Sequence, residues 1–186
     1  MIASNRETRV GAVGVAPMLL AGLLLLWAGV LMGVSFLAAP AKFAAPSLSL
    51  PVALDVGRQE FGTLNLVEAG FVVATMALAF VVRPSRLVWI CLGLAVAIVP
   101  LQGLWLLLVL DARAELIIQE QTPPPAPWHA LYIALEFVKL AGLLLAGGAG
   151  LRSLARSGRA AAAAHSGLAR SALAASRACA PRFGQS

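Results

Sequence analysis

The sequence has few charged residues: only 12% of its 186 residues are Asp, Glu, Lys or Arg, whereas 60% are hydrophobic. A soluble domain carries about 25% charged residues. So small a share of charge excludes an ordinary soluble domain. The mean hydropathy of +0.89 gives the size of the apolar excess. These apolar side chains need lipid around them, and the composition is therefore typical of an integral membrane protein.

Cysteine and histidine are also scarce, with two residues of each. Cys91 and Cys179 form no CxxC pair and no disulfide framework, which argues against thiol redox chemistry. His129 lies at the start of an apolar run and His165 lies in the C-terminal tail, so no histidine pair is placed to hold a haem inside the membrane. No cluster of residues has the spacing of metal ligands.

Motifs of common catalytic sites are missing as well. The chain has no Walker A motif, which would cradle phosphates, and no GxSxG motif, which would present a nucleophilic serine. We therefore expect no cofactor, no metal ion and no catalytic residue, and we expect that the protein is not an enzyme. An intramembrane enzyme with Glu68 as its acid or base is the lesser alternative.

Four apolar runs are each long enough for a helix that crosses a bilayer, which takes about 20 residues. They cover 13–39, 61–82, 87–110 and 128–151. Polar and apolar residues do not alternate within them, as they would in membrane-spanning strands. The short polar turn 83–86 makes the second and third helices antiparallel neighbours. The predicted fold is all-α, an integral membrane antiparallel four-helix transmembrane bundle.

Prolines mark the expected breaks in these helices. Pro40, Pro46 and Pro51 follow the first run and are expected to break the chain after the first helix. Residues 50–61 then begin a helix, which either lies on the membrane surface or continues into the second span. Pro100 is expected to kink the third helix and to free a carbonyl that needs a polar neighbour or a water molecule.

The distribution of basic residues predicts the orientation. Ten of the 14 Lys and Arg residues lie in the N-terminal segment 1–12, the turn 83–86 and the tail 152–186. Three lie in the first and third loops of the membrane domain 13–151, which are on the other side of the membrane. The positive-inside rule then predicts a protein of the bacterial inner membrane with both termini on the cytoplasmic side. The tail, rich in Ala, Ser and Arg, is expected to be disordered or a loosely held surface helix. Its positive charge favours membrane lipids, and not nucleic acid, as partners.

Polar residues inside the spans form the candidate site. Counted from the ends of the runs, Glu68 lies about 10 Å, and Gln102 and Glu136 about 12 Å, from the same membrane boundary. Ser35 is a little shallower. Charges at this depth cost on the order of 2.5–3.5 kcal/mol, so they need partners. Glu136 and Lys139 are spaced to pair within one helix. Glu68 is then left to share Lys139, to hydrogen-bond to Gln102 or to stay protonated. The candidate buried polar site comprises Asn65, Glu68, Gln102, Glu136 and Lys139.

A non-enzymatic membrane scaffold, subunit or assembly factor is the first function consistent with this site. In that case the buried charges only fix the register of the helices. Two rows of small residues, Gly29 with Gly33 and Gly142 with Ala146 and Gly150, have the spacing of close helix contacts. They would pack against a second copy of the chain or another membrane protein.

A proton-linked carrier or channel for a small solute or ion is the alternative function. Its centre would be Glu68, Glu136 and Lys139, because two carboxylates around one ammonium group can hold a proton or admit a cation. Pro100 would interrupt the third helix and so open a path for the solute. A bundle this small would have to form an oligomer to act as a carrier.

Two stretches resemble a known family. LWAGVLMGVSFLAAPAKF at 26–43 is similar to the first-helix pattern (tryptophan, glycines, Phe and Ala-Pro-x-x-Phe) of a family of small bacterial multipass membrane proteins related to the eukaryotic transmembrane-protein-205 group. WHALYIALEFVKL at 128–140 looks like the last helix of that family, where His129 would match a histidine near the helix start. The sequence departs from the family where Glu136 and Lys139 stand in place of a polar uncharged residue. The resemblance implies a four-helix fold and a membrane location, but no reaction.

Overall fold

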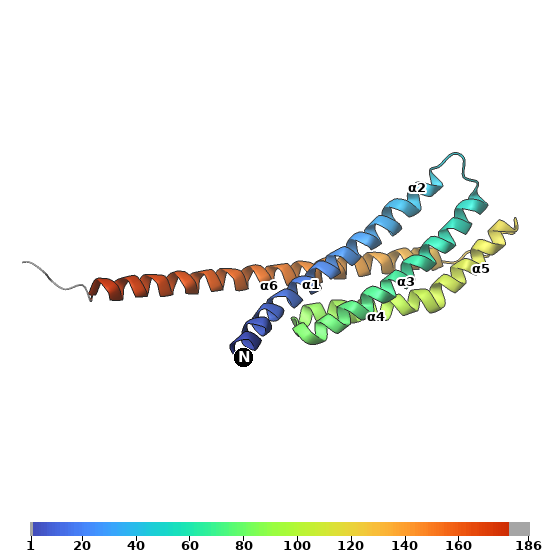
Figure 1. The fold of residues 1–186 in the computed structure, drawn as a ribbon. Coiled ribbons are helices and arrows are strands. Elements are labelled where there is room, and N and C mark those ends of the chain that lie inside the picture. The colour runs from blue at the N-terminus through green and yellow to red at the C-terminus, as the bar shows by residue number, and fades with distance from the viewer. Residues whose placement is uncertain (1, 179–186) are drawn as a thin grey trace, which may run out of the picture. The chain divides into compact units, whose positions relative to one another are not determined.

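The computed structural model describes residues 2–178, which are helical apart from the connections 44–49, 83–85 and 119–127 (Figure 1). The elements in chain order are α1 (Ile2–Leu31), η1 (Met32–Ala38), α2 (Ala39–Phe43), α3 (Leu50–Val82), α4 (Arg86–Leu101), η2 (Gln102–Leu106), α5 (Leu107–Ile118) and α6 (Trp128–Ala178). The segments η1 and η2 are π-helical. The predicted all-α class is therefore confirmed for these residues.

Four helical segments of the described chain are long and apolar enough to cross a membrane. They cover Gly14–Phe43, Leu50–Val82, Arg86–Ile118 and Trp128–Ala160. The predicted number of candidate spans is confirmed, and each segment is longer than its apolar run. The second segment is longer because residues 50–60 form one continuous helix with residues 61–82 in α3, which is one of the two predicted alternatives.

The connection between α3 and α4 follows from its local sequence. Arg83 ends α3 in the left-handed region, with φ at 50°, and its N–H donates to the carbonyl of Ala79. Pro84 follows at once and cannot continue the helix, since it has no N–H to donate. After α5 the residue with a positive φ is Glu120, at 60°, and the proline-rich residues 122–127 that follow are not helical.

The predicted break after the first helix lies at the connection 44–49, which contains Pro46, but Pro40 does not end the helix, contrary to the prediction. Pro40 lies in the first turn of α2, directly after η1. At the end of η1 the hydrogen bonds span five residues, so the N–H of Ala39 donates to the carbonyl of Val34. The proline therefore enters the helix where the regular pattern of bonds is already displaced, and the helix ends only after Phe43.

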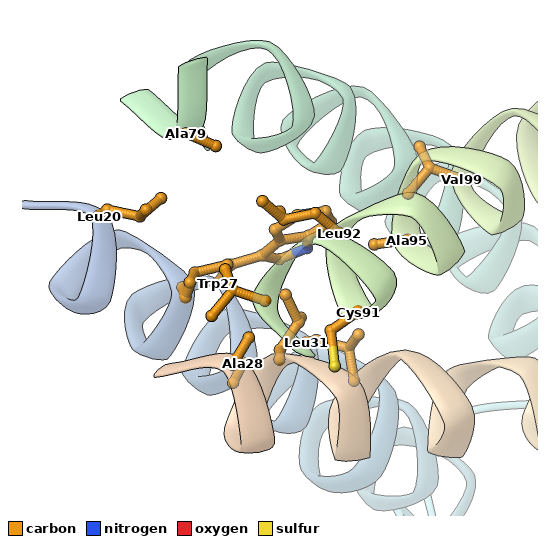
Figure 2. Close-up of a cluster of buried hydrophobic side chains, with 13 residues drawn as sticks. Leu20, Trp27, Ala28, Leu31, Ala79, Cys91, Leu92, Ala95 and Val99 are labelled. Atoms are coloured by element: carbon orange, nitrogen blue, oxygen red, sulfur yellow. The ribbon is translucent and has the colours of Figure 1, made fainter. Parts of the chain in front are cut away.

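The apolar core lies between α1, α3, α4 and α6. Figure 2 shows part of it, including Trp27 and Leu31 of α1 with Leu92 and Ala95 of α4. Trp27 is fully buried and stacks on Phe71 of α3, with ring centroids 5.7 Å apart and ring planes 5° apart. Helices in lipid associate chiefly through such close packing, because lipid tails are as apolar as the side chains themselves.

The row of small residues on α6 packs inside the chain. A Cβ added at Gly142 would lie 3.8 Å from the Cβ of Cys91, and one added at Gly150 would lie 3.0 Å from the Cβ of Ala21. Ala146 between them is fully buried. The row thus contacts α1 and α4 of the same chain, and it is not open to a partner.

Gly147 is in a tighter contact than its neighbour Gly148. An added Cβ at Gly147 would come within 2.7 Å of the Leu25 side chain, whereas one at Gly148 would meet nothing within 4 Å. We expect Gly147→Val to lower the free energy of unfolding by about 1–3 kcal/mol more than Gly148→Val, which carries the same change in helix propensity. Unfolding of both purified variants by SDS in mixed micelles measures the difference. Equal losses would contradict the packing of α6 against α1.

The chain divides into two units, Met1–Gly150 and Leu151–Ser186. In the second unit α6 continues from residue 151 to Ala178, so the described part of the tail is helical. Residues 179–186, and with them Cys179, lie outside the described residues, and the expected disorder stays a prediction there. Cys91 of the first unit is a buried free thiol.

Candidate functional site

Glu68 of α3 and Lys139 of α6 form a fully buried ion pair. The Nζ atom of Lys139 donates to both carboxylate oxygens of Glu68, at 2.7 Å to Oε1 and 2.6 Å to Oε2. The indole Nε1 of Trp27 in α1 donates to the same Oε1 at 3.0 Å. Of the three possibilities predicted for Glu68, the sharing of Lys139 is therefore the one found in the structure.

Glu136 of α6 joins the same ammonium group. The Nζ atom of Lys139 lies 2.8 Å from its Oε1, as predicted from their spacing in one helix. Gln102 donates from Nε2 to the same Oε1 at 3.0 Å, and Ser35 donates from Oγ to Oε2 at 2.8 Å. Gln102 thus binds Glu136 and not Glu68. We refer to the resulting network as the polar cluster, which consists of Trp27, Ser35, Glu68, Gln102, Glu136 and Lys139.

Two neutral donors to Glu136 lie in π-helical segments. Ser35 belongs to η1 and Gln102 is the first residue of η2. A π turn holds one more residue than the regular turn and so changes which side chains face a neighbouring helix; such turns are frequent at functional sites. Hydropathy and residue spacing carry no signal for a π turn. Only Pro100, two residues before η2, indicated an irregular helix here.

Asn65 is the predicted site residue that bonds outside the polar cluster. Its Nδ2 donates to the carbonyl of Val99 at 2.9 Å, next to Pro100. The carbonyl that Pro100 frees is that of Val96, four residues earlier, so this bond is not the polar neighbour that the proline was expected to require. The side chain of Asn65 also lies close to the backbone of Gly103, since a Cβ added at Gly103 would collide with it. Asn65 therefore supports the third helix and not the buried charges.

Trp27 and Ser35 belong to the polar cluster although the predicted site omits them. Ser35 had one available signal, since its expected depth is close to that of the buried acids. Trp27 has the sequence context of an ordinary core aromatic. A buried tryptophan usually finds an acceptor for its N–H, and this rule is the signal that could have connected Trp27 with Glu68.

The polar cluster holds two acids and one base, all of them buried. With all three ionised, Glu68, Glu136 and Lys139 leave one negative charge uncompensated. An uncompensated charge is costly in a region without water, so the cluster favours one additional positive charge. The Oε1 atom of Gln102 is also a buried acceptor without a hydrogen-bond partner among the described residues.

A cavity of about 260 Å³, which we name the inner cavity, reaches the polar cluster. Ser35 and Glu136 both line it, whereas Glu68 does not. The apolar part of its wall comes from η1, α2, α3 and α6 and includes the side chains of Phe36, Phe43, Phe61, Tyr132 and Ile133. Glu136 is therefore the acid of the cluster that a small molecule in this cavity would meet.

An outer cavity of about 330 Å³ adjoins the inner one. The two share four lining residues, namely Phe43, Phe61, His129 and Tyr132. Phe61 and Tyr132 touch edge to face, with ring centroids 5.2 Å apart. Phe43 and His129 adjoin the connections 44–49 and 119–127, so both cavities lie toward the end of the bundle that carries these two connections.

Charged residues of the outer cavity are mostly paired. Lys42 forms an ion pair with Glu60, and Arg58 bridges Asp55 and Glu115 at 2.8 Å each. Such partly exposed pairs contribute little to stability, about 0–1 kcal/mol each. They connect α2 with α3, and α3 with α5, beside the outer cavity.

The fold and the polar cluster together define a class of protein: an all-helical chain with four helices that are apolar and long enough to span a membrane, and with paired ionisable side chains in its interior. No group of three or more His, Cys, Asp or Glu side chains that could hold a metal ion occurs within the described residues. The chain matches no protein-family model, no curated protein and no solved structure. Its function has to be argued from the site.

Proposed function

We propose that the chain is an integral protein of a bacterial inner membrane, whose four helices cross the bilayer as an antiparallel bundle with both termini in the cytoplasm. The second and third candidate spans have 33 residues each. Such helices are about 50 Å long, more than the roughly 30 Å of the hydrocarbon core, so their ends extend into the headgroups. The distribution of Lys and Arg supports the orientation. Both cavities then lie toward the side of the membrane opposite the cytoplasm.

Within this bundle the polar cluster acts as the proton- or cation-binding site of a proton-linked carrier for a small solute. One observation carries this proposal: Glu136 belongs to a cluster with an excess of acid and also lines the inner cavity. A carboxylate that compensates a buried ammonium group and faces an open volume can exchange a proton for a cationic group. Ionisable residues within membrane spans often mark such pathways. The small size of the bundle requires an oligomer for this function.

Glu136→Gln is expected to abolish solute-driven proton movement. With a single acid and a single base, the cluster would carry no excess charge and would bind no proton. The measurement uses proteoliposomes that contain a trapped pH-sensitive dye and receive gradients of small amines, carboxylates or alcohols. We expect at least one class of solute to move protons about tenfold faster than in empty liposomes, and Glu136→Gln to remove this difference.

Glu68→Gln also makes the cluster neutral and is expected to have the same effect. Glu120→Gln is the matched control, because Glu120 is an exposed acid in the connection before α6. It should leave the rate unchanged. If no class of solute moved protons faster than in empty liposomes, or if both buried variants kept the full rate, the carrier proposal would be wrong.

A scaffold or assembly factor is the second candidate, and one observation favours it. A Cβ added at Gly29 or Gly33 would meet nothing within 4 Å, so this row is uncovered in the single chain. Rows with this spacing allow another helix backbone to approach closely in a membrane. A monodisperse monomer after purification would count against both the scaffold and the oligomeric carrier.

Membership in the family related to the transmembrane-protein-205 group is likewise proposed, on the stretches 26–43 and 128–140. Trp27 of the first stretch and Lys139 of the second both contact Glu68. The stretches that carry the resemblance therefore supply part of the polar cluster. The resemblance suggests no reaction.

A further inference from the structure

The inner cavity combines one carboxylate with several aromatic rings. Glu136 is the carboxylate, and no Lys or Arg is among the residues that line this cavity. Lys139 contacts Glu136 without lining the cavity, and Lys42 lines only the outer cavity, where Glu60 pairs with it. A ligand in the inner cavity therefore meets one carboxylate and the imidazole of His129, but no side chain of Lys or Arg.

The two oxygens of Glu136 have different contacts. Its Oε1 accepts from both Lys139 and Gln102, whereas Oε2 accepts from Ser35, and the side chain of Tyr132 also hydrogen-bonds to Glu136. Ser35, Tyr132 and Glu136 all line the inner cavity, so the donors to Glu136 from the cavity wall are neutral hydroxyl groups. An ammonium group of a ligand can donate to Glu136 in place of one of these hydroxyls. Such a charge-assisted hydrogen bond is about twice as strong as a neutral one.

The rest of the wall suits an apolar body that carries a positive charge. Phe36, Phe43, Phe61 and Tyr132 line the cavity. The faces of aromatic rings attract cations, and they attract them more strongly where water is excluded. Few polar groups within a mainly apolar wall are typical of small-molecule sites, where they fix the orientation of the ligand.

The volume limits the size of the ligand. At about 30 Å³ per water molecule in the liquid, 260 Å³ corresponds to about nine water molecules, or to a ligand of about nine non-hydrogen atoms. Phenethylammonium has this size and has a primary ammonium group at one end and an aromatic ring at the other. Phenethyl alcohol has the same shape and size without the charge.

We propose that the inner cavity binds a small lipophilic ammonium ion, with the ammonium group on Glu136 and Ser35 and the apolar body among the aromatic rings. This inference rests on the carrier function proposed above and names its class of solute. The ammonium ion supplies the positive charge that the polar cluster lacks. A proton on Glu136 and the ammonium ion would then exclude each other, which is the condition for exchange between them.

Isothermal titration calorimetry of the full-length protein in a neutral detergent tests the proposal with phenethylammonium chloride and phenethyl alcohol as probes. We expect the Kd of the ammonium ion to be at least about tenfold lower than that of the alcohol. This is the difference expected when a ligand lacks a hydrogen bond between charged groups. Glu136→Gln should remove this difference. Equal Kd values for the two probes in the wild-type protein would overturn the inference.

A second pair of variants keeps the test decisive if Glu136→Gln does not fold. Phe43 is half exposed, so Phe43→Ala is tolerated, and we expect it to raise the Kd of the ammonium ion several-fold. Phe80→Ala removes an exposed ring that packs on Trp89 away from the cavity, and it should leave the Kd unchanged. Equal Kd values for the two variants would contradict the assignment of the cavity.

The two proposals fail separately. If another class of solute drives protons in the liposome assay while phenethylammonium binds no more tightly than the alcohol, the carrier function stands and the ammonium assignment is wrong. If phenethylammonium binds as expected but no solute moves protons, the site is a binding site and the carrier function is wrong.

Discussion

Lys139→Met is expected to lower the free energy of unfolding by about 3–5 kcal/mol, the usual cost of removing one partner from a buried ion pair. Lys139 is 2% exposed, and its Nζ contacts Glu68 at 2.6 Å and Glu136 at 2.8 Å. Methionine fills a similar volume but leaves both carboxylates in the interior without a cation. The loss should be measured by SDS-driven unfolding of the purified protein in mixed micelles.

Val138→Met is the matched control for this prediction. Val138 precedes Lys139 in α6, and its side chain is 46% exposed. A substitution there should change the free energy of unfolding by no more than about 0.5 kcal/mol. If Lys139→Met cost no more than Val138→Met, the ammonium group would not be the shared partner of two buried acids.

Trp27→Ala is expected to cost about 3–5 kcal/mol of stability, the range for deletion of a large buried aromatic side chain. The substitution removes the stacking on Phe71 and leaves a cavity between α1, α3 and α4. It also removes the N–H that donates to Glu68. Thermal unfolding in detergent, followed by circular dichroism, should report a large fall in the Tm.

Two further variants separate packing from hydrogen bonding at Trp27. Trp27→Phe keeps most of the ring but loses the donor, so its cost should be about 1.5–3 kcal/mol, the value of a hydrogen bond to a charged group. Leu26→Ala changes a neighbour that is 57% exposed and should cost about 0.5 kcal/mol or less. If Trp27→Ala behaved like Leu26→Ala, the described core would be wrong.

The number of candidate spans could be predicted because a run of some 20 apolar residues has few alternatives to a helix in lipid. The ends of the helices could not be predicted in the same way. Residues 50–60 are polar enough to end an apolar run, yet they remain helical. Pro51 suits a first helical turn, and Arg58 pairs with Asp55 one turn away. Hydropathy measures neither effect.

The charged part of the site could be predicted because buried charges in lipid need partners of opposite sign. Lys139 is the only Lys or Arg inside the four apolar runs, so it is the only basic partner that they offer to Glu68 and Glu136. The neutral partners were harder to assign, since Ser35 and Gln102 bind Glu136 through the register of η1 and η2. That register depends on backbone hydrogen bonds five residues apart, which leave no periodic pattern in the sequence.

A double-mutant cycle on Glu68 and Lys139 tests most directly whether acid and base from two helices compensate each other in the interior. The variants are Glu68→Gln, Lys139→Met and the combination of both, and the free energy of unfolding of each is measured in mixed micelles. We expect the double variant to be more stable than Lys139→Met alone, with a coupling energy of about 2–3 kcal/mol. If the losses of the two single variants summed to the loss of the double variant within about 0.5 kcal/mol, the pairing of these two residues would be contradicted.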